Sequence, residues 1–244
     1  MRRITWLGHA TVLLELAGAR LLTDPLLRRR VAHLRRHAPR PVALGPVDGV
    51  LISHAHHDHL DRPTLRTLAR AETMAVVPRG VAPLLRGLPF GVVREVRAGD
   101  AVAVGGVQVE AVPAWHPTRR FPHRATHAAL GYLVERVWFA GDTDFHPEME
   151  ALRGRVDVAL VPIWGWGPTL GPGHLDPASA AQAVALVRPE VVVPIHWGTL
   201  LPLGMRRRHR AVLTAPATAF AAQVARAAPR VRVVTLAVGA SLDA

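Results

Sequence analysis

The sequence predicts a single α/β domain built from two β-sheets, each covered by helices. The first half of the chain is a succession of short apolar runs separated by turns, which is typical of β-strands. The second half alternates such runs with segments of helical pattern. With 244 residues, half of them hydrophobic (50%), the chain can build one sizeable core. Because no Ser-, Gln- or Gly-rich linker divides it, we expect residues 1–244 to form one domain.

The elements are expected in the following order. Strands in the first half share apolar and β-branched residues and are expected at 3–7, 12–16, 20–23, 47–52, 74–77, 91–96, 101–104 and 107–113. Ala17-Gly18 provides a hairpin turn between the second and third of these strands. Strands of the second half are expected at 128–135, 136–140, 156–162, 191–195 and 231–236. Helices are expected at 63–70, 177–187 and 217–227, the first with a proline near its first turn.

The composition excludes several classes of protein. There is no cysteine, so structural disulfides and thiolate metal ligands are excluded, which is compatible with a reducing compartment. The first residues lack the long apolar run of a signal peptide, and no run of about 18 apolar residues appears that would span a membrane. We therefore expect a cytoplasmic protein without a membrane span.

The formal charge of +12 has two interpretations, and every basic residue is an arginine. One is a basic surface that attracts anionic partners, nucleic acid among them. The other is a compositional habit that favours Arg across the whole sequence. Arginines cluster at 28–30, 35–36 and 206–208, but no aromatic residues interleave with them as stacking platforms for bases would require.

A histidine cluster directly follows the expected strand at 47–52. His54, His56, Asp58 and His59 fit the spacing H-x-H-x-D-H. A strand projects alternate residues to one side, so His54 and His56 can point together at one metal ion. The turn that follows redirects Asp58 and His59 towards a second position. Imidazole and carboxylate groups suit zinc, iron or manganese, and such clusters are candidate metal sites.

Three later residues occupy comparable places, where an apolar strand gives way to a loop. They are His116 in Ala114-Trp115-His116-Pro117, Asp142 in Ala140-Gly141-Asp142-Thr143, and His196 in Pro194-Ile195-His196-Trp197. Taken singly, His116 fits an ordinary loop histidine and Asp142 a helix N-cap. What joins them to the first motif is the resemblance to a known family that all of these motifs carry together.

In these motifs and their order, the sequence resembles the metallo-β-lactamase superfamily over nearly its whole length. The resemblance implies a four-layer αββα sandwich and two divalent metal ions, zinc first, with manganese or iron as alternatives. It assigns His54, His56 and His116 to the first ion. It assigns Asp58, His59 and His196 to the second, with Asp142 bridging the pair. Metal ions roughly 3.5–4 Å apart can share a water and lower its pKa enough to supply hydroxide at neutral pH.

Two N-terminal motifs are similar to a subgroup that includes ascorbate-6-phosphate lactonase and the phospholipase D that cleaves N-acyl-phosphatidylethanolamine. They are Leu7-Gly8-His9-Ala10-Thr11 and Leu22-Thr23-Asp24-Pro25. The resemblance places His9 and Asp24 beside the metal loop, where they would orient ligands through hydrogen bonds. The alternative for Asp24 is that it caps a helical segment that follows it.

Substrate contacts are expected from two further stretches. His174 precedes the expected helix at 177–187, and either protonates a leaving group and binds substrate, or packs structurally near the helix start beside Asp176. Trp166 lines a substrate cleft or fills core space. Arg119 follows His116 closely and can hold a phosphate or carboxylate by paired hydrogen bonds.

The sequence also departs from parts of the superfamily. Cysteine-dependent drug-hydrolysing lactamases are excluded by composition. Flavodiiron-type members carry glutamate where this chain has His56, which disfavours oxygen-reducing chemistry. We therefore expect a hydrolase that uses a metal-bridging hydroxide, oriented by Asp58, on an ester-like bond in a phosphodiester, a phosphorylated lactone or a similar small anionic molecule. The alternatives are a nuclease acting on RNA or DNA and a metal-binding scaffold without turnover.

Overall fold

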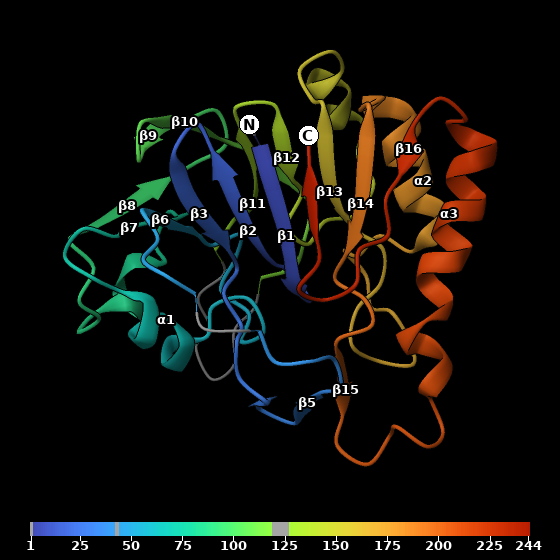
Figure 1. The fold of residues 1–244 in the computed structure, drawn as a ribbon, viewed down its shortest axis with the longest axis horizontal. Coiled ribbons are helices and arrows are strands. Elements are labelled where there is room, and N and C mark those ends of the chain that lie inside the picture. Colours follow the sequence, from blue (N-terminus) through green and yellow to red (C-terminus); the bar gives the residue numbers. More distant parts are fainter. Residues whose placement is uncertain (1, 42–43, 119–126) are drawn as a thin grey trace.

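The computed structural model describes residues 2–41, 44–118 and 127–244, which form two seven-stranded sheets and one small sheet (Figure 1). In spatial order, the first sheet contains β17 (Ser241–Asp243), β1 (Arg2–Gly8), β2 (Thr11–Leu16), β3 (Ala19–Thr23), β6 (Gly49–Leu51), β7 (Met74–Pro78) and β8 (Val92–Val96). The second contains β16 (Arg232–Val233), β14 (Val191–Ile195), β13 (Val158–Pro162), β12 (Val137–Phe139), β11 (Ala129–Val134), β10 (Val107–Ala114) and β9 (Ala101–Val104). The small sheet contains β15 (Leu200–Pro202), β5 (Leu34–Arg36) and β4 (Arg30–Val31).

Three apolar clusters define the layers of the molecule. The largest lies between the two large sheets and joins residues such as Leu14 of the first to Tyr132 of the second. Helix α1 (Arg62–Leu68) covers the outer face of the first sheet through Leu65. Helices α2 (Pro177–Val187) and α3 (Ala215–Ala227) cover the second sheet through Val184 and Phe220, on the opposite side of the molecule from α1 (Figure 1). The predicted αββα sandwich is confirmed.

Parallel strands in both sheets position the candidate site. β3, β6, β7 and β8 are parallel neighbours in the first sheet, and β12, β13 and β14 are parallel neighbours in the second. Ligand sites in such sheets form beyond the carboxyl ends of the strands. Asp24 follows β3, and His54 lies three residues beyond β6. Asp142 and His196 follow β12 and β14 in the same way, so both sheets deliver polar side chains to one edge.

Most expected elements are present near the predicted bounds. Ala17 (φ 47°) and Gly18 (φ 89°) form the predicted hairpin turn, with Leu16 paired to Ala19. Two positive φ angles match the twist that a two-residue hairpin requires. Helix α1 spans Arg62–Leu68 where 63–70 was expected, α2 matches its predicted bounds, and α3 begins two residues earlier than expected. No helix within the described ranges is long and apolar enough to cross a bilayer.

Two sets of predictions need correction. The strand expected at 231–236 is reduced to Arg232–Val233, because only these residues pair with β14. The short strands β4, β5, β15 and β17 were not predicted, and neither were the 3₁₀ helices η1 (Ala82–Leu85), η2 (Pro147–Leu152) and η3 (Arg210–Leu213). Runs of two or three residues are too short to show an alternating pattern. β5 pairs with β15 and β1 pairs with β17, so their partners lie far away in the chain.

Candidate metal centre

Three predicted ligands form a first cluster of imidazole nitrogens. The Nε2 atom of His54 lies 2.9 Å from Nδ1 of His56, which lies 3.1 Å from Nε2 of His116. His54 and His56 come from the loop after β6, whereas His116 comes from the end of β10 in the other sheet. Their ligand atoms lie within 4.8 Å of one another. The two sheets thus bring three nitrogens to one point, at which a cation can bind.

A second cluster lies beside the first and adds two carboxylates. Nε2 of His59 lies 3.1 Å from Nε2 of His196, 3.1 Å from Oδ2 of Asp142 and 3.6 Å from Oδ2 of Asp58. Nε2 of His196 lies 3.2 Å from the other Asp142 oxygen. Asp142 also has a ligand oxygen within 4.8 Å of the ligand nitrogens of His116 and His174. The Asp142 carboxylate therefore lies at the junction of the two clusters.

Backbone carbonyls fix the tautomers of two histidines. Nδ1 of His116 lies 2.7 Å from the carbonyl oxygen of Gly173, and Nδ1 of His196 lies 2.7 Å from that of Trp164. A carbonyl only accepts, so each Nδ1 must carry the proton. In the neutral ring the inward-facing Nε2 atom then has a free lone pair. Both rings are thus set to bind a cation through Nε2.

Side chains fix two further inward-facing rings, those of His54 and His59. The Asp24 carboxylate accepts hydrogen bonds from the Ser53 hydroxyl (2.5 Å), from the Ser53 backbone N–H (2.7 Å) and from Nδ1–H of His59 (2.7 Å). Because its proton is used on Asp24, the Ser53 hydroxyl accepts from Nδ1–H of His54 at 2.9 Å. His54 and His59 therefore also turn Nε2 lone pairs inward when neutral.

This donor set fits metal ions. Neutral imidazoles whose lone pairs face one another at about 3 Å repel unless a cation or a proton lies between them. Oδ1 of Asp142 is buried and accepts no hydrogen bond from any described residue, which leaves a carboxylate oxygen available as a ligand. Buried polar atoms are normally paired, so such an atom requires an explanation. Imidazole nitrogens with carboxylate oxygens are the donors that zinc, iron and manganese accept.

Burial keeps the histidines of the first cluster in the form that binds metal. It lowers the pKa of His54 well below the ordinary value. Burial, together with the neighbouring His116, lowers the pKa of His56 to about 4. Burial also lowers the pKa of His116. Metal ligands must be deprotonated, and these three rings are neutral at physiological pH without any metal.

Carboxylates set the charge of the second cluster. Burial alone would lower the pKa of His59, but Asp142, Asp58 and Asp24 raise it well above the ordinary value. Burial would likewise raise the pKa values of Asp58 and Asp142, but the surrounding imidazoles, His59 among them, hold both well below the usual range. Without a metal the second cluster therefore holds a proton, in a place where a divalent ion fits.

The two residues expected to support the ligands contact the clusters. His9 is buried, and its Nε2 atom lies 3.0 Å from Oδ2 of Asp58. Asp24 is fully buried against Ser53 and His59 as described above. Residues 25–29 form no helix, so Asp24 does not act as a helix cap.

A cleft of about 520 Å³ opens onto the clusters. Asp58 and Asp142 line it on the polar side, together with His174. The small sheet supplies an apolar wall through Val31 and Leu34, which pack in one cluster with Trp166. This wall could not be predicted from sequence, because its strands are short and arginine-rich. A substrate would therefore meet a polar floor and an apolar side.

The loop before α2 places His174 next to Asp142 and Asp176 at the start of the helix. Nε2 of His174 lies 3.5 Å from Oδ2 of Asp142, and its Nδ1 faces the carbonyls of Gly171 and Pro172 at 3.1 and 3.2 Å. Burial opposes protonation of His174, but Asp142 and these carbonyls raise its pKa above the ordinary value. Asp176 caps α2 by accepting the N–H groups of residues 178 and 179. Arg119 lies outside the described residues.

Sequence reasoning missed the groups that hold the ligand rings. Ser53 precedes the histidine motif, yet a serine in that position carries no signal of its own. Gly173 and Trp164 act through backbone carbonyls, which any residue would provide. Only the run Gly171-Pro172-Gly173 hinted at a loop beside the site.

A family profile and two related proteins match most of this chain. The sequence profile described as beta-lactamase superfamily domain matches residues 19–197, which contain all seven converging side chains. A UPF0173 metal-dependent hydrolase of Methanopyrus kandleri is 35% identical over 211 residues, which are 82% of this chain and 86% of that protein. N-acyl-phosphatidylethanolamine-hydrolyzing phospholipase D 1 of Caenorhabditis elegans is 30% identical over 230 residues, 82% of this chain but 64% of that protein.

A solved structure supports the fold assignment. Igni18, a metallo hydrolase from the archaeon Ignicoccus hospitalis, has a TM-score of 0.71 against this chain at 22% sequence identity. The similarity covers 99% of this chain and 97% of Igni18. The architecture is therefore similar from end to end.

Proposed function

The chain belongs to the metallo-β-lactamase superfamily, in the subgroup of the N-acyl-phosphatidylethanolamine-hydrolyzing phospholipase D, and from this premise we propose which bond it cleaves. It is a metal-dependent hydrolase. Its substrate is a small anionic molecule with an ester-like bond, a phosphodiester or a phosphorylated lactone. The phospholipase D name of one relative favours the phosphodiester.

The observation that carries this proposal is the junction of the two ligand clusters at Asp142. Two divalent ions, zinc in our proposal, would generate hydroxide from a shared water near neutral pH and stabilise negative charge on the substrate. We assign His54, His56 and His116 to the first ion, and Asp58, His59 and His196 to the second, with Asp142 between them.

The remaining residues of the cleft have roles that follow from their positions. Asp58 is held by His9 and orients the attacking water through its carboxylate. His174 carries a proton on Nε2 in its charged form, because its Nδ1–H is directed at two carbonyls. It donates that proton to the leaving oxygen. Trp166 and the apolar wall hold the part of the substrate that does not react, and exclude water.

Elemental analysis of the protein purified without added metal, followed by an activity screen, tests the proposal. The substrates are bis(p-nitrophenyl) phosphate, a phosphorylated lactone and a neutral ester. His56→Ala should lose metal and abolish turnover. His57→Ala removes an exposed imidazole from the same loop and should keep the metal content. A His56→Ala protein with unchanged metal content and rate contradicts the ligand assignment. Metal-loaded protein that is inactive on every substrate favours a scaffold without turnover.

A further inference from the structure

A groove next to the metal centre combines basic and aromatic side chains. Arg79, Arg97, Trp115 and His127 line a hollow of about 480 Å³. They come from four separate segments of the chain, so no single stretch of the sequence contains all four. Trp115 directly precedes His116, which places the hollow beside the first ligand cluster.

The parallel strands explain why the two arginines are neighbours. Pro78 at the end of β7 pairs with Val96 at the end of β8, and Arg79 and Arg97 are the residues that follow. The backbone N–H of Arg79 donates to the carbonyl of Val96 at 3.0 Å. Adjacent strands lie about 4.8 Å apart, so both guanidinium groups can reach one phosphate group. β7 also neighbours β6, so this arginine pair lies at the same edge of the sheet as His54.

The two guanidinium groups are available to a ligand. Both arginines are exposed, and among the described residues no carboxylate forms an ion pair with either of them. The nearby acidic groups have other partners. Asp100 accepts the backbone N–H of Arg97 at 2.8 Å, and Glu148 accepts the indole N–H of Trp115 at 3.4 Å. Arginine pairs of this kind recognise phosphate.

Trp115 has the properties of a stacking platform. One face of its ring packs on buried His146, with centroids 5.1 Å apart and an interplanar angle of 10°. Its backbone N–H is bound to the hydroxyl of Thr143 at 2.9 Å. The residue is nevertheless 51% exposed and lines the hollow, and among the described residues only the ring of His146 stacks on it. A fixed and exposed aromatic ring is what a nucleobase stacks on.

We propose that this groove binds single-stranded nucleic acid, with a base stacked on Trp115 and the adjoining phosphate held by Arg79 and Arg97. The inference goes beyond the proposed hydrolase chemistry and does not depend on it. A base and a phosphate joined in one ligand match the ring and the arginine pair together, whereas phosphate alone would use only the arginines. The formal charge of +12 adds long-range attraction for such a strand.

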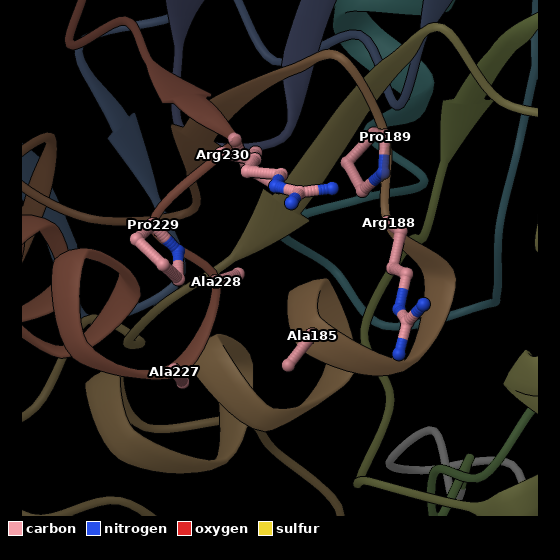
Figure 2. Close-up of a pocket in the computed structure, with 8 residues that line it drawn as sticks. Ala185, Arg188, Pro189, Ala227, Ala228, Pro229 and Arg230 are labelled. Carbon is pink, nitrogen blue, oxygen red and sulfur yellow. The ribbon is translucent and has the colours of Figure 1, made fainter.

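A second hollow with two arginines provides a matched control. It measures about 570 Å³ and lies where α2 and α3 end, with Arg188 and Arg230 at its border (Figure 2). None of the described residues that line it is aromatic. The carboxyl ends of helices also carry partial negative charge, which disfavours anions. Removing this pair changes the net charge by the same amount as removing Arg79 and Arg97.

The experiment measures fluorescence anisotropy of a labelled ten-nucleotide oligothymidylate with the full chain, at several salt concentrations. The double variant Arg79→Ala/Arg97→Ala should weaken binding at least tenfold. It should also reduce the slope of log affinity against log salt by about 0.7, because both arginines contact one phosphate. The double variant Arg188→Ala/Arg230→Ala should change the affinity less than twofold. Equal losses in the two variants would show unspecific attraction only, and overturn the proposal.

Trp115 is tested with a substitution pair and a competitor. Trp115→Leu should weaken oligothymidylate binding about tenfold but leave polyphosphate binding unchanged, and Trp115→Phe should restore part of the loss because it keeps a ring. Unchanged oligothymidylate binding in Trp115→Leu overturns the stacking role. If AMP displaces the probe as effectively as unlabelled oligothymidylate does, the proposal that the ligand is a strand is overturned. Anisotropy reports the complex itself, so an inactive metal centre does not affect the result.

Discussion

Replacement of Asp24 by Asn changes a hydrogen-bond acceptor that holds ligand side chains in place, but it removes no proposed metal ligand. Asp24 is fully buried, and its two oxygens accept three hydrogen bonds from Ser53 and His59. Asparagine has the same shape but replaces one oxygen by an N–H₂ group. That group cannot face the backbone N–H of Ser53, which is a fixed donor. It must therefore take the position of Oδ2, facing the Ser53 hydroxyl and Nδ1 of His59.

The consequence is a change of tautomer at His59. The Ser53 hydroxyl can rotate to accept from the new N–H₂ group, but Nδ1 of His59 can accept only if it loses its proton. In the neutral ring the proton then moves to Nε2, which lies 3.1 Å from both His196 and Asp142. A proton there occupies the position of the second metal ion. Loss of such supporting groups typically lowers metal affinity about 10- to 100-fold, or about 1.4–2.7 kcal/mol.

Metal titration of chelator-treated protein by calorimetry measures this effect. Asp24→Asn should weaken the binding event at the cluster of His59 most, and the event at the cluster of His54 to a smaller extent, because the Ser53 hydroxyl that Asp24 orients also contacts Nδ1 of His54. Asp61→Asn is the matched control. Asp61 is also a buried carboxylate, but it caps α1 and binds Arg28 and Thr64, neither of which is a proposed ligand. The control should lower thermal stability without changing metal affinity. The reasoning is refuted if Asp24→Asn binds both ions within twofold of the original protein.

Three other substitutions test separate parts of the structure. His174→Gln should slow substrates with poor leaving groups by about 10²-fold or more but spare p-nitrophenyl esters. The rate of the unsubstituted enzyme should fall as pH rises through the pKa of His174, because only the protonated ring can donate to the leaving group. Burial raises the pKa of Tyr132, so the stability that this phenol contributes is complete below pH ~10 and lost above it. Tyr132→Phe should therefore flatten the alkaline limb of a denaturation series and cost about 1–3 kcal/mol at pH 7, because the carbonyl of Ile52 loses its hydrogen bond. In Gly173→Ala, the added Cβ overlaps Pro117 at a φ of 77°. This displaces the carbonyl that holds His116, so elemental analysis should find less metal per chain.

The sequence could predict the parts of the site whose residues lie close together in the chain. His54, His56, Asp58 and His59 lie within six consecutive residues after an apolar strand, and alternation along the strand already points two of them one way. His116 and the later ligands have no such local signal, and only the family resemblance placed them. The structure brings their ligand atoms within hydrogen-bonding distance of the first group. Their roles as ligands stay predictions that metal analysis can test.

What sequence could not predict depends on contacts between distant segments. The apolar wall of the cleft exists because β5 pairs with β15, which joins Arg36 to Leu200. The basic groove exists because two strands of one sheet end opposite Trp115 of the other. Along the chain, Trp115 has no arginine within three residues on either side. A search for interleaved aromatic and basic residues does not join Trp115 to Arg79 or Arg97, although the fold brings them together.

Backbone conformations near the clusters indicate that the fold, and not the metal, fixes much of the geometry. His9, Asp24 and His196 have φ angles of 54°, 32° and 62°, in a region that residues with a Cβ rarely adopt. Each such residue costs about 1–3 kcal/mol and persists only where surrounding contacts enforce it. Here the N–H of His196 donates to the carbonyl of His9 at 2.9 Å, and the N–H of His9 donates to the hydroxyl of Thr199 at 2.7 Å. These bonds link the β1–β2 turn to the loop after β14, so the strain is balanced by contacts between the two sheets. The ligand rings can then keep their orientation when no ion is bound, which lowers the entropy cost of binding one.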